Sequence, residues 1–245
     1  MNRQNIRYFR NFKFCFFTRN GGVSKKNFCS LNCAHNIEEK KEYVKKNREI
    51  VRKNFCKTKK IILLNQTHSN RVIFLNKKIP RVIQADGIIT DRKDLTLGIL
   101  TADCAPIVII GKRNFGIVHA GWKGALSNII TNAVKILGSK GEMNSDLYFF
   151  IGPHLKKKSF EVKIDFVSNL VKKGNFDNFL IKNKEKYFFD FSGFLKKKIL
   201  DLGISKISVS NLDTFSNPDK FFSYRFYSKK GIINCGRQIS LVCFK

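Results

Sequence analysis

The sequence predicts an α+β protein in which stacked mixed β-sheets are flanked by helices, in a single domain over residues 1–245. Short β-rich apolar segments outnumber the segments with helical periodicity. Many of these segments are close neighbours in the chain, which favours this arrangement over a doubly wound parallel sheet. We find no internal repeat and no Pro- or Ser-rich linker, so no domain boundary is indicated.

The expected strands alternate with polar turns along the whole chain. An aromatic run at 8–18 comes first, and the segments 61–64 and 72–75 follow as a hairpin whose polar connection carries His68. The remaining expected strands are 85–90, 98–100, 106–110, 115–118, 147–151, 206–210, 221–226 and 238–244. We expect the last two to form a final strand pair.

Four segments have helical character. The clearest is 122–137, where apolar residues recur at every third or fourth position. This helix begins directly after His119, so its first turn presents backbone N–H groups next to that imidazole, an arrangement that can bind an anion. Segments 38–55, 165–173 and 192–202 are the other expected helices.

The net charge of +29 has two interpretations. A basic protein of this kind can bind nucleic acid or a membrane surface. However, lysines far outnumber arginines and are scattered along the chain among many Asn, Ile and Phe residues. A nucleic-acid site gathers its basic residues on one face among stacking aromatics. We therefore attribute the charge to an AT-rich coding sequence and expect no specific nucleic-acid partner.

Cysteine usage and hydropathy indicate a cytoplasmic protein. The seven cysteines are odd in number and lack the spacing of a disulfide framework, which favours mostly buried, free thiols in a reducing compartment. No segment approaches the ~20 apolar residues of a membrane helix. The basic N-terminus has no apolar region followed by a cleavage site, so we expect neither secretion nor a membrane partner.

Three chemically distinctive residues end expected strands: His68, Cys104 and His119. Two imidazoles and one thiolate form a known catalytic zinc set that leaves a fourth position open. The residues are 36 and 15 positions apart, so the fold would have to assemble the site. Two other interpretations remain at this point: a Cys104 nucleophile with His119 as its base, or a buried structural thiol. Asp103 is the expected supporting residue, able to orient a ligating imidazole or to hold the backbone.

The sequence resembles the polyphenol oxidase or laccase-domain family, some members of which act as purine nucleoside phosphorylases. The resemblance is specific because many short blocks follow one another in order over nearly the whole chain. These blocks lie at 17–24, 30–32, 47–48, 66–68, 85–90, 101–106, 119–124, 151–153, 160–162 and 236–241.

The resemblance implies an α+β fold and one zinc ion held by His68, Cys104 and His119. It also implies phosphorolysis of adenosine, inosine and S-methyl-5′-thioadenosine to free base and ribose 1-phosphate, with adenosine deamination as a side activity. Gln66 lies in the block of the first ligand, and we expect it to support the site. Copper-dependent phenol oxidation is the older description of the family, but one Cys and a few His are too few for several copper ions.

Four cationic residues are the candidates for binding substrate and phosphate: Lys123, Arg225, Arg237 and Arg19. Lys123 is the preferred phosphate ligand because it lies in the first turn of the helix after Trp122. The chain departs from the family pattern at three positions. Ser69 replaces a glycine, Lys123 replaces an arginine, and His154 stands where Cys or Ala is common. Lysine keeps the charge of arginine but not its bidentate geometry.

Overall fold

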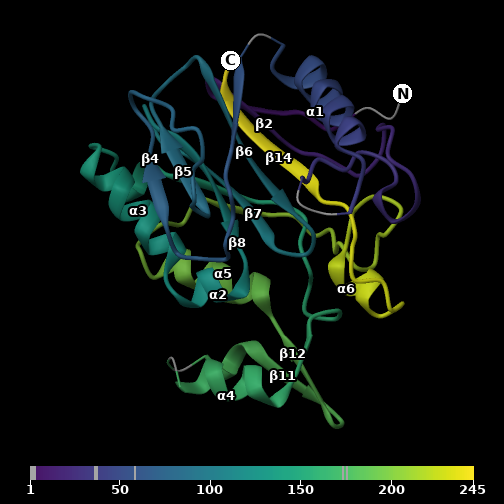
Figure 1. Cartoon of the computed structure of the whole chain (residues 1–245). Coiled ribbons are helices and arrows are strands. Elements are labelled where there is room, and N and C mark those ends of the chain that lie inside the picture. The colour runs from purple at the N-terminus through teal and green to yellow at the C-terminus, as the bar shows by residue number, and fades with distance from the viewer. Residues whose placement is uncertain (1–3, 36–37, 58, 173, 175) are drawn as a thin grey trace.

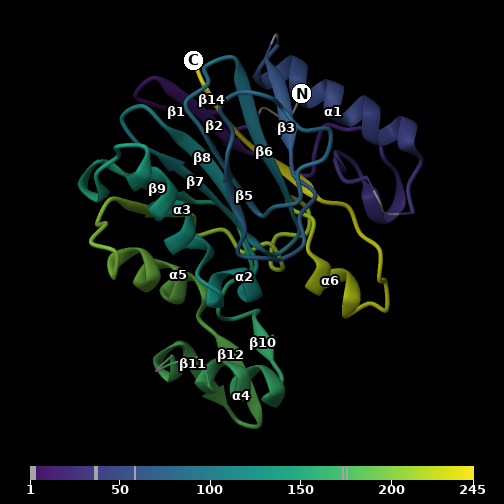
Figure 2. The same cartoon turned by 60° about the vertical axis from the view of Figure 1, so that its left-hand side comes forward.

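Two large β-sheets pack face to face, and helices cover their outer surfaces (Figures 1 and 2). The computed structural model describes residues 4–35, 38–57, 59–172, 174 and 176–245. The predicted class, mixed sheets flanked by helices, is confirmed. None of the helices in the described part of the chain combines the length and apolar character needed to traverse a bilayer.

The first sheet has five strands and joins the two ends of the chain. The last strand, β14, lies between an N-terminal strand and β6 and is antiparallel to both. β3 pairs parallel with β6 at the far edge. In spatial order the strands are β1 (Arg7–Phe9), β2 (Phe12–Phe16), β14 (Gln238–Phe244), β6 (Leu95–Thr101) and β3 (Lys60–Leu63).

The second sheet has six strands and carries the site described below. Its centre is an antiparallel hairpin of two fully buried strands, β7 and β8. In spatial order the strands are β13 (Ile207–Val209), β9 (Tyr148–Ile151), β7 (Ala105–Ile110), β8 (Phe115–Ala120), β5 (Gly87–Thr90) and β4 (Val72–Phe74). β7 is apolar throughout and β8 is interrupted only by His119, as expected of strands that are buried on both faces.

Alternation along β7 connects two of the hydrophobic cores. Val108 and Ile110 face the first sheet and pack in the core between the sheets. Ile107 and Ile109 face the opposite way, toward α3 (Ile129–Ser139) and α5 (Phe191–Leu200). A third core lies between the first sheet and α1 (Lys41–Phe55). The result is a helix–sheet–sheet–helix sandwich.

A smaller unit projects beside α5 (Figures 1 and 2). It consists of α4 (Ile164–Lys172) and the antiparallel strands β10 (Glu161–Val162), β12 (Lys186–Phe189) and β11 (Leu180–Asn183). The sequence predicted its helix but none of its strands. Short 3₁₀ turns occupy Lys26–Phe28, Asn144–Asp146 and Asp177–Phe179.

The expected single helix over 122–137 is wrong in one respect. The chain forms α2 (Trp122–Leu126) and then, after a break, α3. Asn128 causes the break by adopting a left-handed conformation with φ of 68°, which asparagine tolerates better than most residues. Both pieces keep their apolar residues toward the sheet, so the periodicity survives the break.

Three strand expectations also need correction. The segment 8–18 is a hairpin of β1 and β2 and not one strand, because Arg10 turns the chain with φ of 50°. Segments 61–64 and 72–75 do not pair with each other, since β3 and β4 belong to different sheets. Within 221–226 the chain starts a short helix, α6 (Tyr224–Ser228), whose N-cap Ser223 accepts a hydrogen bond from the Phe226 N–H.

Glu142 closes the far end of the β7–β8 hairpin. Its carboxylate accepts hydrogen bonds from the backbone N–H groups of Lys112, Arg113 and Asn114 and from the Asn114 side chain, at 2.8–3.0 Å. Burial raises the pKa of Glu142, but these donors outweigh burial and lower the pKa below its ordinary value. The turn therefore depends on an ionised carboxylate.

We predict that Glu142→Gln lowers the free energy of unfolding at neutral pH by about 1–3 kcal/mol, because buried N–H donors lose a charged acceptor. A depressed pKa stabilises the fold above the unfolded-state value of about 4.3 and ceases to do so as the pH falls through the folded-state value. The deficit should therefore shrink in acid, as measured by urea unfolding at several pH values. Glu185→Gln, in the exposed β11–β12 turn, is the matched control. An equal deficit at all pH values would contradict the prediction.

Candidate metal centre

Three neighbouring strands of the six-stranded sheet bring the site together at one edge. β8 is antiparallel to both β7 and β5, so the end of β8 meets the beginnings of the other two. His119 lies near the end of β8, Cys104 directly precedes β7, and Asp86 directly precedes β5. Residues far apart in sequence thereby become neighbours.

His68 completes the cluster from the segment that crosses from the first sheet to the second. Its Nε2 lies 3.8 Å from Cys104 Sγ, and its ring centroid lies 4.8 Å from that of His119. The ligand atoms of His68, Cys104 and His119 all lie within 4.8 Å of one another. His119 is buried, Cys104 is half-buried and His68 is exposed, so the cluster opens to solvent on the His68 side.

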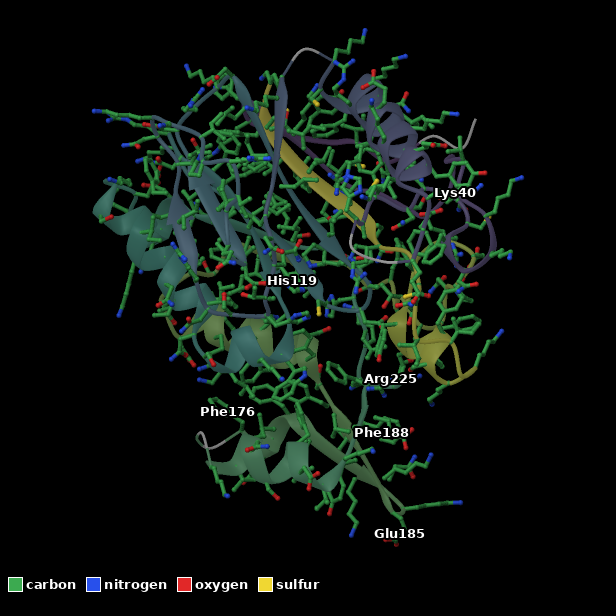
Figure 3. All side chains as sticks on the ribbon, viewed as in Figure 1. Lys40, His119, Phe176, Glu185, Phe188 and Arg225 are labelled. Atoms are coloured by element: carbon green, nitrogen blue, oxygen red, sulfur yellow. The ribbon has the colours of Figure 1, made fainter. Side chains whose placement is uncertain are left out.

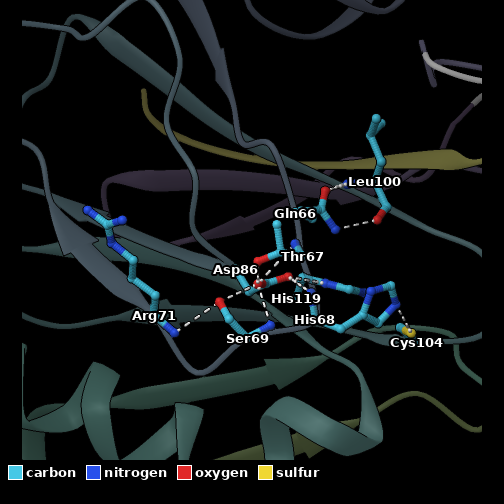
Figure 4. A network of polar contacts seen from close by, with 9 residues as sticks. All are labelled: Gln66, Thr67, His68, Ser69, Arg71, Asp86, Leu100, Cys104 and His119. Atoms are coloured by element: carbon cyan, nitrogen blue, oxygen red, sulfur yellow. Dashed lines mark hydrogen bonds and ion pairs between the residues drawn. The ribbon is translucent and has the colours of Figure 1, made fainter.

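Asp86 holds the His119 imidazole and the backbone of His68 in place (Figure 4). One carboxylate oxygen lies 2.8 Å from His119 Nδ1 and accepts the His68 N–H at 3.0 Å. The other accepts the N–H groups of Thr67 and Ser69 and the Ser69 hydroxyl. A carboxylate on Nδ1 fixes the tautomer that leaves His119 Nε2 free for a metal. Asp86 was not among the predicted site residues, and its position fell within the expected strand 85–90, whereas β5 begins at Gly87.

The electrostatics of the cluster favour a thiolate. Burial raises the pKa of Cys104, but the neighbouring His119 and His68 outweigh it and lower the pKa. Burial likewise lowers the pKa of His119, whereas Cys104 and Asp86 raise it overall. Burial raises the pKa of Asp86, and the donors from His119 and Ser69 bring it well below its usual value. The anionic sulfur is the form that binds a metal.

Two glycines allow the next helix to approach the cluster. A Cβ at Gly121 would lie 2.9 Å from the His68 ring and 3.3 Å from Cys104 Sγ. A Cβ at Gly124 would lie 2.6 Å from the Ser69 carbonyl oxygen. Any side chain at these positions would push α2 away from the His68 segment. Trp122, between them, packs its ring against Phe166 of α4 at 4.9 Å between centroids.

Asp103 and Gln66 both support the segments that carry ligands. Asp103 accepts hydrogen bonds from the Thr214 hydroxyl and the Arg225 N–H, each at 2.6 Å, and so ties the Cys104 turn to α6. The amide of Gln66 bonds in both directions with the backbone of Leu100 at 2.8 Å, which anchors the His68 segment to β6. Neither side chain is among the three ligands.

The four cationic candidates occupy different settings. Arg19 is buried, and its guanidinium donates to the Cys29 and Pro218 carbonyls and the Tyr227 hydroxyl. Arg225 donates to the Glu161 carbonyl at 2.8 Å. In Figure 3 Arg225 lies between His119 and the small sheet that carries Phe188. Lys123 is exposed next to Trp122, and Arg237 is half-buried.

His154 is not part of the cluster. It is fully buried and lies 2.8 Å from the Gly152 carbonyl and 2.9 Å from the Ser192 hydroxyl. His35, the fourth histidine, is exposed in the segment before α1 and is likewise outside the cluster.

The donor set fits a single divalent metal ion. Zinc–nitrogen and zinc–sulfur bonds of about 2.0–2.3 Å place two tetrahedral ligands ~3.3–3.8 Å apart, and the His68–Cys104 separation of 3.8 Å agrees with this. Three protein ligands leave a fourth position for water or substrate, as in catalytic sites. No other cluster of three potential ligands occurs in the described part of the chain.

Comparison with known proteins points to one family. The family described as multi-copper polyphenol oxidoreductase laccase matches residues 13–245. A purine nucleoside phosphorylase of Rickettsia prowazekii is 34% identical over 177 residues, covering 70% of this chain and 73% of that protein. Another, from Haemophilus influenzae, is 31% identical over 235 residues and covers 93% and 92%.

Solved structures share the fold. YfiH of Bacillus licheniformis, described as a hypothetical protein, superposes with a TM-score of 0.85 at 26% identity, covering 96% of this chain and 93% of that one. YlmD of Geobacillus stearothermophilus gives 0.84 at 22% identity, covering 96% and 91%. The match over residues 13–245, with relatives at 31–34% identity, shows that the chain belongs to the multi-copper polyphenol oxidoreductase laccase family.

Proposed function

We propose that the protein is a zinc-dependent purine nucleoside phosphorylase that converts adenosine, inosine and S-methyl-5′-thioadenosine to free base and ribose 1-phosphate. The observation that carries the proposal is the cluster of His68, Cys104 and His119, which offers two imidazoles and a thiolate within 4.8 Å. Relatives named purine nucleoside phosphorylase, at 31–34% identity, support the reaction class.

A bound zinc ion would supply a Lewis acid that orients the nucleophile and offsets its charge. The protein's own contribution begins with Asp86, which orients the His119 imidazole and holds the backbone of His68 beside it. Lys123, at the start of α2, is the proposed phosphate ligand, and its exposed ammonium is engaged only with the Trp122 ring in the contacts described. Arg225 and Arg237 are the next candidates. Arg19 has its donors already bound to protein oxygens.

The same centre would support adenosine deamination as a side activity if water replaced phosphate and attacked C6 of the purine.

We also propose a cytoplasmic location. All seven cysteines are free, and most are buried, as a reducing compartment allows. Nucleosides and phosphate are the proposed partners.

Two other functions make different demands on the cluster. A metal-independent cysteine hydrolase would use Cys104 as nucleophile and His119 as base. The Asp86–His119 pair would suit such a base as well. The hydrolase leaves His68 without a role, however, although its Nε2 lies 3.8 Å from Cys104 Sγ, whereas a metal site uses it as the third ligand. A copper-dependent polyphenol oxidase would need further copper ligands. The described residues offer one three-ligand cluster.

The decisive assay incubates purified protein with inosine and phosphate, with and without a chelator, alongside metal analysis. We expect hypoxanthine and ribose 1-phosphate, about one zinc per chain, and loss of turnover after zinc removal that added zinc restores. Turnover unchanged by complete zinc removal would favour the cysteine hydrolase. Oxidation of a phenol without nucleoside turnover would favour the oxidase.

We predict that Cys104→Ser and His119→Ala each remove both zinc and nucleoside turnover, because the site loses one of three ligands. Matched controls are Cys29→Ser and His35→Ala, which alter exposed residues outside the cluster. Elemental analysis and phosphorolysis are measured on the same samples. Full zinc retention in either ligand variant would show that the ligand set is wrong.

We predict that Asp86→Asn weakens zinc binding by roughly 10–100-fold while the ligands remain present. The amide offers one acceptor oxygen in place of two, so His68, Ser69 and His119 compete for it. Competition with a chromogenic chelator measures the affinity. Asp94→Asn, at a surface pair with Arg92, is the control. Wild-type affinity in Asp86→Asn would mean that the cluster is held without this carboxylate.

A further inference from the structure

A polar cavity lies at the opposite end of the β7–β8 hairpin from the metal centre. Its volume is about 280 Å³, which suits a ligand at the small end of the range that protein pockets accept. Cys104 precedes β7 and His119 lies near the end of β8, whereas the cavity adjoins the turn between the two strands. The length of β7 separates the two places by roughly 20 Å. The lining residues are Phe74, Asn76, Asp91, Arg113, Asn114 and Lys140.

The strand pairing brings these residues together from separate segments. β5 is parallel to β4 and antiparallel to β8, so the end of β5 lies beside the end of β4 and the start of β8. Asp91 directly follows β5, Phe74 ends β4, and Asn114 directly precedes β8. α3 packs beside β4 and ends just before Lys140 (Figure 1). The cavity is therefore built on regular elements of the sheet and its covering helix.

Asn114 is the buried member of the lining, and its side chain has a fixed orientation. The residue is only 3% exposed. Its Nδ2 donates to the Glu142 carboxylate at 3.0 Å, and its backbone N–H donates to the same oxygen at 2.8 Å. The amide oxygen, Oδ1, has no hydrogen-bond partner in the described residues and yet is not shielded from solvent, so it faces the cavity. Glu142 thus holds an acceptor toward the interior of the cavity.

Three charged side chains surround this acceptor. Asp91, Arg113 and Lys140 all line the cavity, and none of them forms an ion pair with another residue of the described ranges. Lys140 Nζ instead lies over the Phe74 ring, 4.6 Å from its centroid. The cavity therefore presents two cations, one carboxylate and one amide oxygen to a ligand.

An acidic α-amino acid carries the complementary groups, two carboxylates and one ammonium. The guanidinium of Arg113 can bind one carboxylate through two parallel N–H bonds, and Lys140 supplies a point charge for the other. The ammonium has three donors and no acceptor, which matches the Asp91 carboxylate and the Asn114 oxygen. We propose that this cavity is a binding site for an acidic α-amino acid, L-aspartate or L-glutamate.

Other small anions match the cavity less well. Succinate has both carboxylates but no ammonium, so it would leave Asp91 beside a ligand of like charge. Inorganic phosphate has the same defect. L-Asparagine keeps the ammonium but has one carboxylate, so it would leave one of the two cations without its partner. The pattern of charges in the ligand, more than its net charge, is what the cavity selects.

Isothermal titration calorimetry on the whole protein tests the proposal with L-aspartate, L-glutamate, succinate, L-asparagine and inorganic phosphate. We expect saturable binding of one acidic amino acid per chain, and binding at least about 10-fold weaker for each of the other three, because each loses a charge-assisted hydrogen bond. Arg113→Gln and Asp91→Asn should each weaken binding of the amino acid by roughly 10–100-fold for the same reason. Lys135→Gln and Asp165→Asn alter exposed charges outside the cavity and should bind as the wild type does.

The absence of saturable binding of both acidic amino acids at millimolar concentrations would overturn the proposal. Binding of succinate or phosphate as tightly as the amino acid would also overturn it, since the cavity would then be a general anion site, and so would wild-type affinity in Asp91→Asn. The affinity should be unchanged in Cys104→Ser and after treatment with a chelator. A loss of binding there would place the amino acid at the metal centre and contradict the proposal, whereas the phosphorylase assay is decided separately.

Discussion

The carboxylate of Asp86 is the contact on which the geometry of the metal centre depends. It bonds to the His119 imidazole and to three consecutive backbone N–H groups of the His68 segment. One buried charge therefore sets the position of two ligands that arrive from different parts of the fold. Removing such an acceptor leaves several buried donors unpaired, which costs more than the loss of a single hydrogen bond.

This arrangement explains why the neighbouring backbone is unusual. His68 and Asp103 adopt left-handed conformations, with φ of 59° and 84°, which few non-glycine residues do. Each is held by a buried network, His68 by Asp86 and Asp103 by Thr214 and the Arg225 N–H. Strained residues of this kind gather at functional sites, where surrounding contacts over-determine the conformation. Two of the ligands, His68 and Cys104, thus lie in or directly after residues whose conformation these networks impose.

Apolar periodicity and strand-end chemistry were enough to predict the layered class and to single out His68, Cys104 and His119, since both signals are local. The break at Asn128 was not predictable, because the same apolar spacing fits one helix or two. Strand pairing was not predictable either. Segments 61–64 and 72–75 are neighbours in sequence and look like a hairpin, but they pair with β6 and β5, which come later in the chain. Asp86 was missed because its partners are 17–33 residues away.

The number of available ligands argues against the multi-copper chemistry that the name of the family describes. Electron transfer from a phenol to oxygen through several copper ions requires several sets of imidazoles. This chain has four histidines in all, and two of them, His35 and His154, lie outside the cluster. His154 also has both ring nitrogens engaged with protein atoms. What remains is one thiolate and two imidazoles around a single open position, a donor set suited to polarising a substrate at one metal ion.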